Sequence, residues 1–120
     1  MRHRRTVKMS TALKKENKLE RPPRGGLATM VEAIRAGIWE EMERDPTVFL
    51  IGEDVGVYGG DFKVTDGILA EFGPERVIDT PIAEAAIVGS AGGAALMGLR
   101  PFTEYKLFEF ISWCFDIFTT

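Results

Sequence analysis

The residue with the clearest chemical potential is one carboxylic acid, Glu84, together with the segment that leads to it. The apolar run 77–79 predicts a strand, which is broken by Thr80 and Pro81. Glu84 then falls in the first turn of a helix predicted over the alanine- and glycine-rich stretch 85–98. Open parallel sheets build ligand sites there, beyond the carboxyl ends of their strands, and a buried glutamate would tend to keep its proton and donate it in a hydrogen bond to a cofactor nitrogen. The alternative is a carboxylate that only stabilises the helix N-terminus.

The elements that must position Glu84 begin with a helix between residues 28–29 and 45–46, where Asp45 and Pro46 end it. Its apolar positions recur every three or four residues, at Leu27, Val31, Ile34, Ile38 and Met42. The run 48–51 is apolar without alternation, which is typical of a strand covered by helices on both faces. This pattern predicts a parallel sheet.

The remaining segments continue the alternation of helices and strands. They are a glycine-rich loop at 52–60, a short helix at 68–72 closed by Gly73 and Pro74, a strand near 102–105 and a final helical segment at 108–118. The loop lacks the ending of a phosphate-binding loop, so its glycines are expected to serve a tight connection. The glycines of 85–98 predict close packing, either on the sheet or between helices across a subunit interface. The order predicts the α/β class, as part of a doubly wound parallel sheet.

Composition excludes several kinds of site. The chain has 120 residues, of which 45% are hydrophobic and 28% are charged, as in ordinary soluble domains, and no apolar run reaches membrane-spanning length. The single cysteine, Cys114, allows no disulfide within the chain and is expected to pack in a core. The single histidine, His3, leaves the body of the chain without a histidine nucleophile system or metal ligand set.

The two ends of the chain differ in character. Residues 1–26 form a basic segment, with nine Lys or Arg against two Glu, and are expected to be a disordered arm. The arm could be a transit peptide, an over-long gene start or a contact for an acidic partner, whereas the acidic remainder argues against nucleic acid. The segment 108–118 is apolar on most sides and ends without a cap, so the chain is expected to be cut off inside its fold or covered there by another polypeptide.

Several stretches carry a family resemblance. They are 30–35, 40–46, 48–56, 58–60, 62–65, 76–84 and 98–101. In these stretches, which lie in ungapped order, the chain resembles the N-terminal portion of the beta subunit of the thiamine-diphosphate-dependent decarboxylase of 2-oxo acid dehydrogenase complexes, of the pyruvate or branched-chain type. The resemblance implies that residues 27–120 are the N-terminal part of a transketolase-like pyrimidine-binding domain.

The resemblance also implies roles for individual residues. Glu84 takes the position whose carboxyl hydrogen-bonds N1′ of thiamine diphosphate, which favours the imino tautomer that removes the C2 proton. Glu53 takes the position of a second acid used in proton communication between two active sites, although a Glu in a glycine loop is more often solvated. Phe110 takes an aromatic position against the aminopyrimidine ring, although a Phe is by default a core residue. Mg²⁺ and the diphosphate belong to the separate alpha subunit.

Two residues depart from the family pattern. Lys106 stands where an uncharged pocket residue is usual, and Ile117 follows Asp116 where an Asp-Gln pair is common. A lysine beside a cationic thiazolium ring is electrostatically unfavourable unless it points away. These departures bear on the geometry of the expected pocket and on activity.

At the level of the whole protein, the resemblance implies two alpha and two beta chains that oxidatively decarboxylate a 2-oxo acid and pass the acyl group to a lipoyl carrier on an acyltransferase core. The present chain alone is expected to be inactive. The compartment would be the cytoplasm in a bacterium or the mitochondrial matrix in a eukaryote. Two other interpretations stay open. One is a non-catalytic short protein that binds partners through its Phe-rich end, and the other is a different thiamine enzyme, such as a transketolase-like or deoxyxylulose-phosphate synthase relative.

Overall fold

The structure, a computed structural model, describes residues 26–119, without the side chains of Phe110, Trp113 and Phe118. The basic segment predicted at 1–26 therefore lies outside the described residues, except for Gly26. The helices and strands are α2 (Met30–Arg44), β1 (Val48–Glu53), η1 (Asp61–Lys63), α3 (Ile68–Phe72), β2 (Val77–Thr80), α4 (Glu84–Leu96), β3 (Arg100–Glu104), η2 (Phe108–Cys114) and α5 (Phe115–Thr119), where η denotes a 3₁₀ helix.

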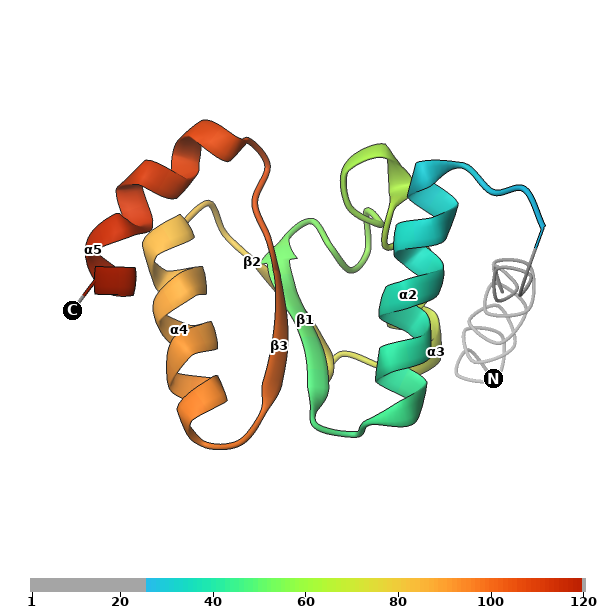
Figure 1. Cartoon of the computed structure of the whole chain (residues 1–120), viewed down its shortest axis with the longest axis horizontal. Coiled ribbons are helices and arrows are strands. Elements are labelled where there is room, and N and C mark those ends of the chain that lie inside the picture. The colour runs from blue at the N-terminus through green and yellow to red at the C-terminus, as the bar shows by residue number, and fades with distance from the viewer. Residues whose placement is uncertain (1–25, 120) are drawn as a thin grey trace, which may run out of the picture.

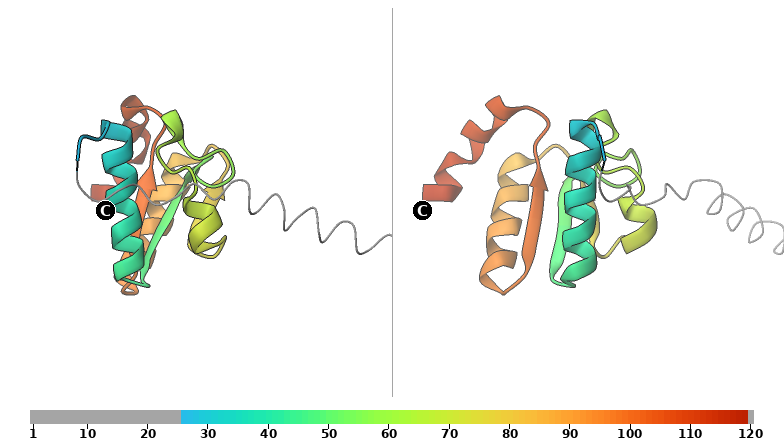
Figure 2. Two further views of the ribbon diagram at one scale, coloured as in Figure 1. Left: turned by 90° about the vertical axis from the view of Figure 1, so that its right-hand side faces the viewer. Right: turned by 45° about the vertical axis from the view of Figure 1, so that its right-hand side comes forward.

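The three strands form one parallel sheet in the order β2-β1-β3. Helices α2 and α3 lie on one side of this sheet, and α4 lies on the other with η2 and α5 beyond it (Figures 1 and 2). The three layers confirm the predicted α/β class, because parallel strands joined by helices need cover on both faces. Within the described residues, no helix combines the length and apolarity that crossing a membrane requires.

Helix α2 begins where a reciprocal capping box satisfies its first amides. The Glu32 backbone N–H donates to Thr29 Oγ1 at 3.2 Å, and the Thr29 N–H donates to Glu32 Oε2 at 2.8 Å. The Thr29 N–H and the Thr29 hydroxyl, which both donate to the Glu32 carboxylate, hold its pKa below its usual value. The helix ends at Arg44, just before Asp45 and Pro46, so both predicted boundaries are confirmed within about two residues.

The predicted apolar stripe of α2 is only partly right. Met42 is buried and Ile38 packs beside the core, but Leu27 and Ile34 are exposed. Trp39, which the stripe does not contain, is buried, and its ring meets Phe72 of α3 edge-on with centroids 5.5 Å apart. The large indole therefore rotates the buried face of the helix toward α3.

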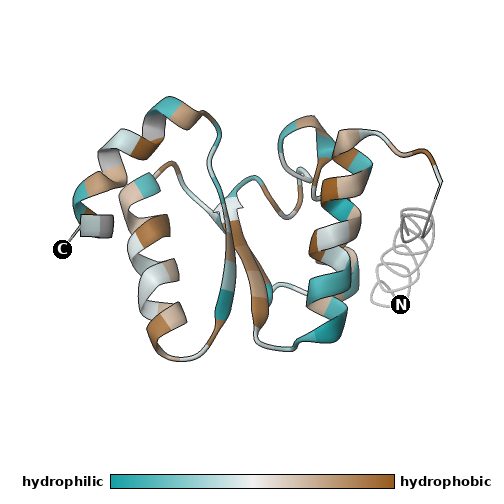
Figure 3. Cartoon of the chain, viewed as in Figure 1, coloured by the Kyte–Doolittle hydropathy of each residue, from teal (hydrophilic) through white to brown (hydrophobic). Residues whose placement is uncertain are grey.

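The core between β1 and the α2–α3 layer contains most of the fully buried side chains. Hydrophobic colour runs along β1 (Figure 3). The core cluster consists of Trp39, Met42, Val48, Leu50, Val55, Ile68 and Val77. Arg76 closes this layer at the start of β2, because its guanidinium donates to the carbonyl oxygens of Met42, Asp45 and Val48. The Met42 carbonyl lies in the last turn of α2, where carbonyls lack partners within the helix, whereas Val48 is the first residue of β1.

Helix α4 is predominantly apolar, yet only one of its faces is covered. Ile87, Val88 and Ala91 are buried, whereas a Cβ on Gly92 or Gly93 would meet nothing within 4 Å. A Cβ on Gly89 would lie 3.9 Å from Ile117 Cδ1. The prediction that these glycines pack tightly on the sheet is wrong for the described residues. The alternative, a helix pair at a subunit interface, stays a prediction.

The last segment departs from a single helix. It forms η2 and then α5, with Phe108 and Phe115 exposed. Cys114, at the junction, is fully buried, which confirms that its thiol packs inside the chain.

Candidate functional site

The carboxyl ends of the three strands meet at one edge of the sheet and bring several acidic residues together. In the register of the sheet, Gly52 of β1 lies beside Asp79 of β2 on one side and Glu104 of β3 on the other. A Cβ on Gly52 would lie 3.0 Å from Glu104 Cβ and 3.1 Å from the Glu104 carbonyl oxygen. The absence of a side chain at Gly52 therefore allows β1 and β3 to approach each other closely here. Glu53 is the next residue of β1.

Glu53 is the most buried carboxylic acid at this edge. Only 8% of it is exposed, although a Glu next to a glycine loop would ordinarily be solvated. Burial raises the pKa of Glu53, and the nearby Glu84 raises it further, whereas Lys106 lowers it. The structure thus brings the two predicted acids, Glu53 and Glu84, close enough to influence each other.

Glu84 is the first residue of α4, as predicted, and is half-buried. The helix has no side-chain cap at Ala83, so its first amides are open at this edge. Glu84 also acts on Cys114, the last residue of η2. The pKa of this thiol is raised first by burial and then by Glu84. Glu84 therefore lies near both the end of β1 and the end of η2.

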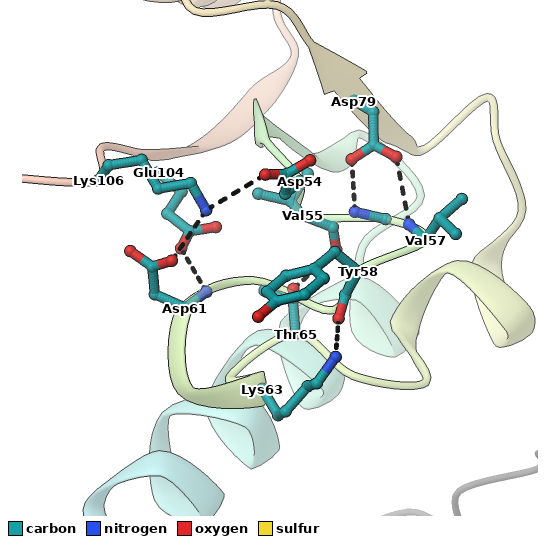
Figure 4. Close-up of polar contacts among 11 residues, drawn as sticks. Asp54, Val55, Val57, Tyr58, Asp61, Lys63, Thr65, Asp79, Glu104 and Lys106 are labelled. Atoms are coloured by element: carbon teal, nitrogen blue, oxygen red, sulfur yellow. Dashed lines mark hydrogen bonds and ion pairs between the residues drawn. The ribbon is translucent and has the colours of Figure 1, made fainter.

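The loop from Asp54 to Gly67 folds over the edge and is held by Asp79. The Asp79 carboxylate accepts the backbone N–H groups of Gly56 at 2.6 Å and Val57 at 3.2 Å (Figure 4). Inside the loop, the buried Thr65 hydroxyl donates to the Val55 carbonyl at 2.7 Å. These bonds hold the loop, which contains the short helix η1, in one conformation.

The backbone conformation of Gly60 is needed for the loop to fold in this way. Its φ of 70° and ψ of 176° lie in a region that is essentially restricted to glycine, and a Cβ would lie 2.7 Å from Thr65 Oγ1. We expect Gly60→Ala to lower the free energy of unfolding by about 2 kcal/mol, measured by urea denaturation. The matched control is Gly37→Ala in α2, where a Cβ meets nothing within 4 Å, and it should stabilise the chain by about 0.5 to 1 kcal/mol. Equal effects would contradict the role of Gly60.

Lys106 does not stand free in the site. Its ammonium donates to Asp61 Oδ1 at 2.9 Å and lies 4.0 Å from Asp54 Oδ2 (Figure 4). Its charge is thus paired with loop carboxylates, and the expectation that a lysine would disfavour a thiazolium ring stays a prediction.

One further prediction concerns the surroundings of Glu84. The side chain of Phe110 lies outside the described residues, so its aromatic role stays a prediction. An open apolar groove lies further along α4, between that helix and β3, and neither Glu84 nor Glu53 lines it. Its walls are formed by Val88, Ala91, Gly92, Ala95, Pro101, Thr103, Tyr105 and Ile117.

Several residues that shape the edge were not predicted. Asp79, Asp61, Glu104 and Thr65 carry the hydrogen bonds that hold the loop. For Asp79 and Glu104 a signal exists in the sequence, since each is the acidic residue at the end of an apolar strand. For Asp61 and Thr65 the partners are known only once the loop is folded.

Comparison with known proteins agrees with this geometry. Residues 27–120 match the family described as the transketolase pyrimidine binding domain. Over 88 residues the chain is 53% identical to the pyruvate dehydrogenase E1 component subunit beta of Rickettsia conorii, a match that covers 73% of this chain and 27% of that protein. A rice mitochondrial pyruvate dehydrogenase E1 component subunit beta-2 is 52% identical, over 68% of this chain and 22% of its own.

A branched-chain relative is equally similar. The 2-oxoisovalerate dehydrogenase subunit beta of Bacillus subtilis is 53% identical over 68% of this chain and 25% of its own length. The chain thus spans about a quarter of the length of these relatives. The three-layer fold, the acids at the strand ends and the match over 27–120 agree with one another, and the chain belongs to the transketolase pyrimidine-binding domain family.

Proposed function

We propose that this chain is the pyrimidine-binding part of the beta subunit of a thiamine-diphosphate-dependent 2-oxo acid dehydrogenase that acts on pyruvate or a branched-chain 2-oxo acid. The observation that carries the proposal is the position of Glu84, which opens α4 at the carboxyl edge of a parallel sheet beside the buried acid Glu53. The relatives named for pyruvate and 2-oxoisovalerate dehydrogenases support it.

The residues at the edge suit the ring half of the cofactor better than its phosphate half. Several carboxylic acids lie around the strand ends and the loop, namely Glu53, Asp54, Asp61, Asp79, Glu84 and Glu104, and Lys106 is already paired with Asp61. A ring nitrogen can accept a proton shared with a carboxyl, whereas a diphosphate would be repelled. This agrees with the proposal that the alpha subunit holds Mg²⁺ and the diphosphate.

In this proposal Glu84 holds a proton on one carboxyl oxygen and donates it in a hydrogen bond to N1′ of the aminopyrimidine ring. Glu53 is the second acid, and a negative charge on Glu84 would disfavour the ionised form of this buried group. Phe110 would pack against the ring. Thiamine diphosphate, when bound, supplies the carbon nucleophile that a 2-oxo acid needs for decarboxylation.

The complete protein is proposed to work as a heterotetramer. A second beta chain and two alpha chains would complete each active site, and the acyl group would pass to a lipoyl group on the acyltransferase core. The part described here would contribute the half of the site that handles the proton at N1′, which is why it needs the alpha subunit for activity.

A chimera tests the proposal. Residues 27–120 would replace the matching segment of the Rickettsia conorii relative, and the product would be purified with that protein's alpha subunit. We expect calorimetry to show saturable, Mg²⁺-dependent binding of thiamine diphosphate and an assay to show decarboxylation of pyruvate. An assembled chimera that binds no cofactor would contradict the proposal and favour a non-catalytic protein. The same segment can replace its counterpart in the Bacillus subtilis relative. Assaying that second chimera with a branched-chain 2-oxo acid compares the two substrate classes.

A further inference from the structure

Lys106 is a charged residue at the carboxyl edge that the proposed cofactor chemistry does not use. It follows β3 by two residues, and only 20% of its side chain is exposed. Its ammonium donates to Asp61 Oδ1 at 2.9 Å and faces Asp54 at 4.0 Å. Both partners lie in the loop that follows β1, so one ammonium group connects the end of β3 to that loop (Figure 4).

Asp61 is anchored to the end of β3 a second time. Its backbone N–H donates to Glu104 Oε1 at 3.3 Å. The other carboxyl oxygen, Glu104 Oε2, is buried without a hydrogen-bond partner in the described part of the chain. Burial raises the pKa of Glu104, and Lys106 acts in the opposite direction. The ammonium of Lys106 therefore partly offsets the cost of burying this carboxyl.

Lys106 also opposes the negative charges that surround Glu53. From α4 and the loop, Glu84, Asp54 and Asp61 all disfavour the ionised form of Glu53, and Lys106 favours it. On the β2 side the residue paired with Glu53 in the sheet register is the uncharged Thr80. Among the described residues that act on Glu53, Lys106 thus supplies the positive charge.

We propose that Lys106 is a positioning residue of this site, whose ammonium ties Asp61 and the loop to the end of β3. Its link to catalysis rests on the proposed function, in which Glu53 and Glu84 serve the cofactor. The link between Lys106, Asp61 and the loop stands on the contacts of this chain alone.

The test compares three variants of the full chain by NMR without cofactor, using ¹³C-labelled glutamate side chains and amide hydrogen exchange. In Lys106→Gln, we expect Glu53 to titrate at higher pH and the Asp61 amide to exchange about tenfold faster, because a charge-assisted hydrogen bond is lost. In Lys106→Arg, which keeps the charge and the donors, both values should stay near those of the original chain. In Asp61→Asn, the amide should exchange faster while Glu53 does not titrate at higher pH, since the ammonium remains.

The outcomes separate a charge effect from a packing effect. If Lys106→Gln leaves the exchange rate of the Asp61 amide unchanged, the proposal is overturned. If Lys106→Gln fails to fold while Lys106→Arg folds, the charge is needed and the proposal is supported. If both fail to fold, the methylene stem rather than the charge is responsible and the proposal is overturned. Since no cofactor is present, a chimera that binds no thiamine diphosphate would leave these results standing.

Discussion

Replacing Glu84 with glutamine in the pyruvate-type chimera should slow exchange of the thiamine C2 proton by about a hundredfold to ten-thousandfold, the range typical of a lost acid or base. A glutamine amide keeps the shape of the side chain and can still donate a hydrogen bond to N1′, but it cannot hand over a proton. Because Glu84 is half-buried at the first turn of α4, the substitution should leave the sheet and the assembly with the alpha subunit intact. Exchange proceeds in deuterated buffer and is stopped at set times by acid, and NMR then measures the C2 proton that remains.

The control for this experiment is Glu71→Gln in α3, an exposed glutamate outside the carboxyl edge. It removes the same charge and should leave C2 exchange at the rate of the parent chimera. Equal exchange rates for the Glu84→Gln and parent proteins, with the cofactor bound in both, would show that another group protonates N1′.

Leu50→Ala should cost about 3 kcal/mol of unfolding free energy, within the range measured for buried Leu to Ala changes. Leu50 lies in the central strand and is 2% exposed, packed in the cluster that joins β1 to α2 and α3. The neighbouring strands and helices hold this position from several directions, so the cavity cannot collapse easily. Urea denaturation of the full chain, followed by circular dichroism, gives the change.

Ile34→Ala is the matched control, because it also truncates an aliphatic side chain but at a position that is 47% exposed. Its loss should stay below about 1 kcal/mol. A loss at Ile34 as large as that at Leu50 would mean that α2 presents a different face to the sheet. It would favour the stripe that the spacing of apolar residues predicts.

The layered architecture could be predicted because it depends on local signals. Pro46 and Gly73 mark the ends of helices, and the uninterrupted apolar run 48–51 requires cover on both faces. The buried face of α2 was predicted less well. Trp39 is larger than any residue of the predicted stripe and packs against Phe72, which lies in another helix and has no periodic relation to it. Periodicity describes one element, whereas burial depends on what lies opposite.

The candidate site was predictable only in part, for a related reason. Glu84 follows from a strand, a proline break and a helix start that are adjacent in the sequence. The burial of Glu53 and the pairing of Lys106 with Asp61 depend on three strand ends meeting at one edge. These contacts join residues up to 45 positions apart, as in the Lys106 to Asp61 hydrogen bond. Composition and spacing carry no information about such pairings.

The two anchors of the loop have a consequence for how the sheet assembles. Asp79 of β2 and Glu104 of β3 reach the loop from opposite sides of β1, and each does so only in the observed alignment of the strands. Sliding β2 by one position would offer Ile78 or Thr80 to the Gly56 and Val57 amides, and both hydrogen bonds would be lost. A misaligned strand would therefore leave the Gly56 and Val57 amides without these acceptors. Closure of the loop thus favours the observed alignment of the strands.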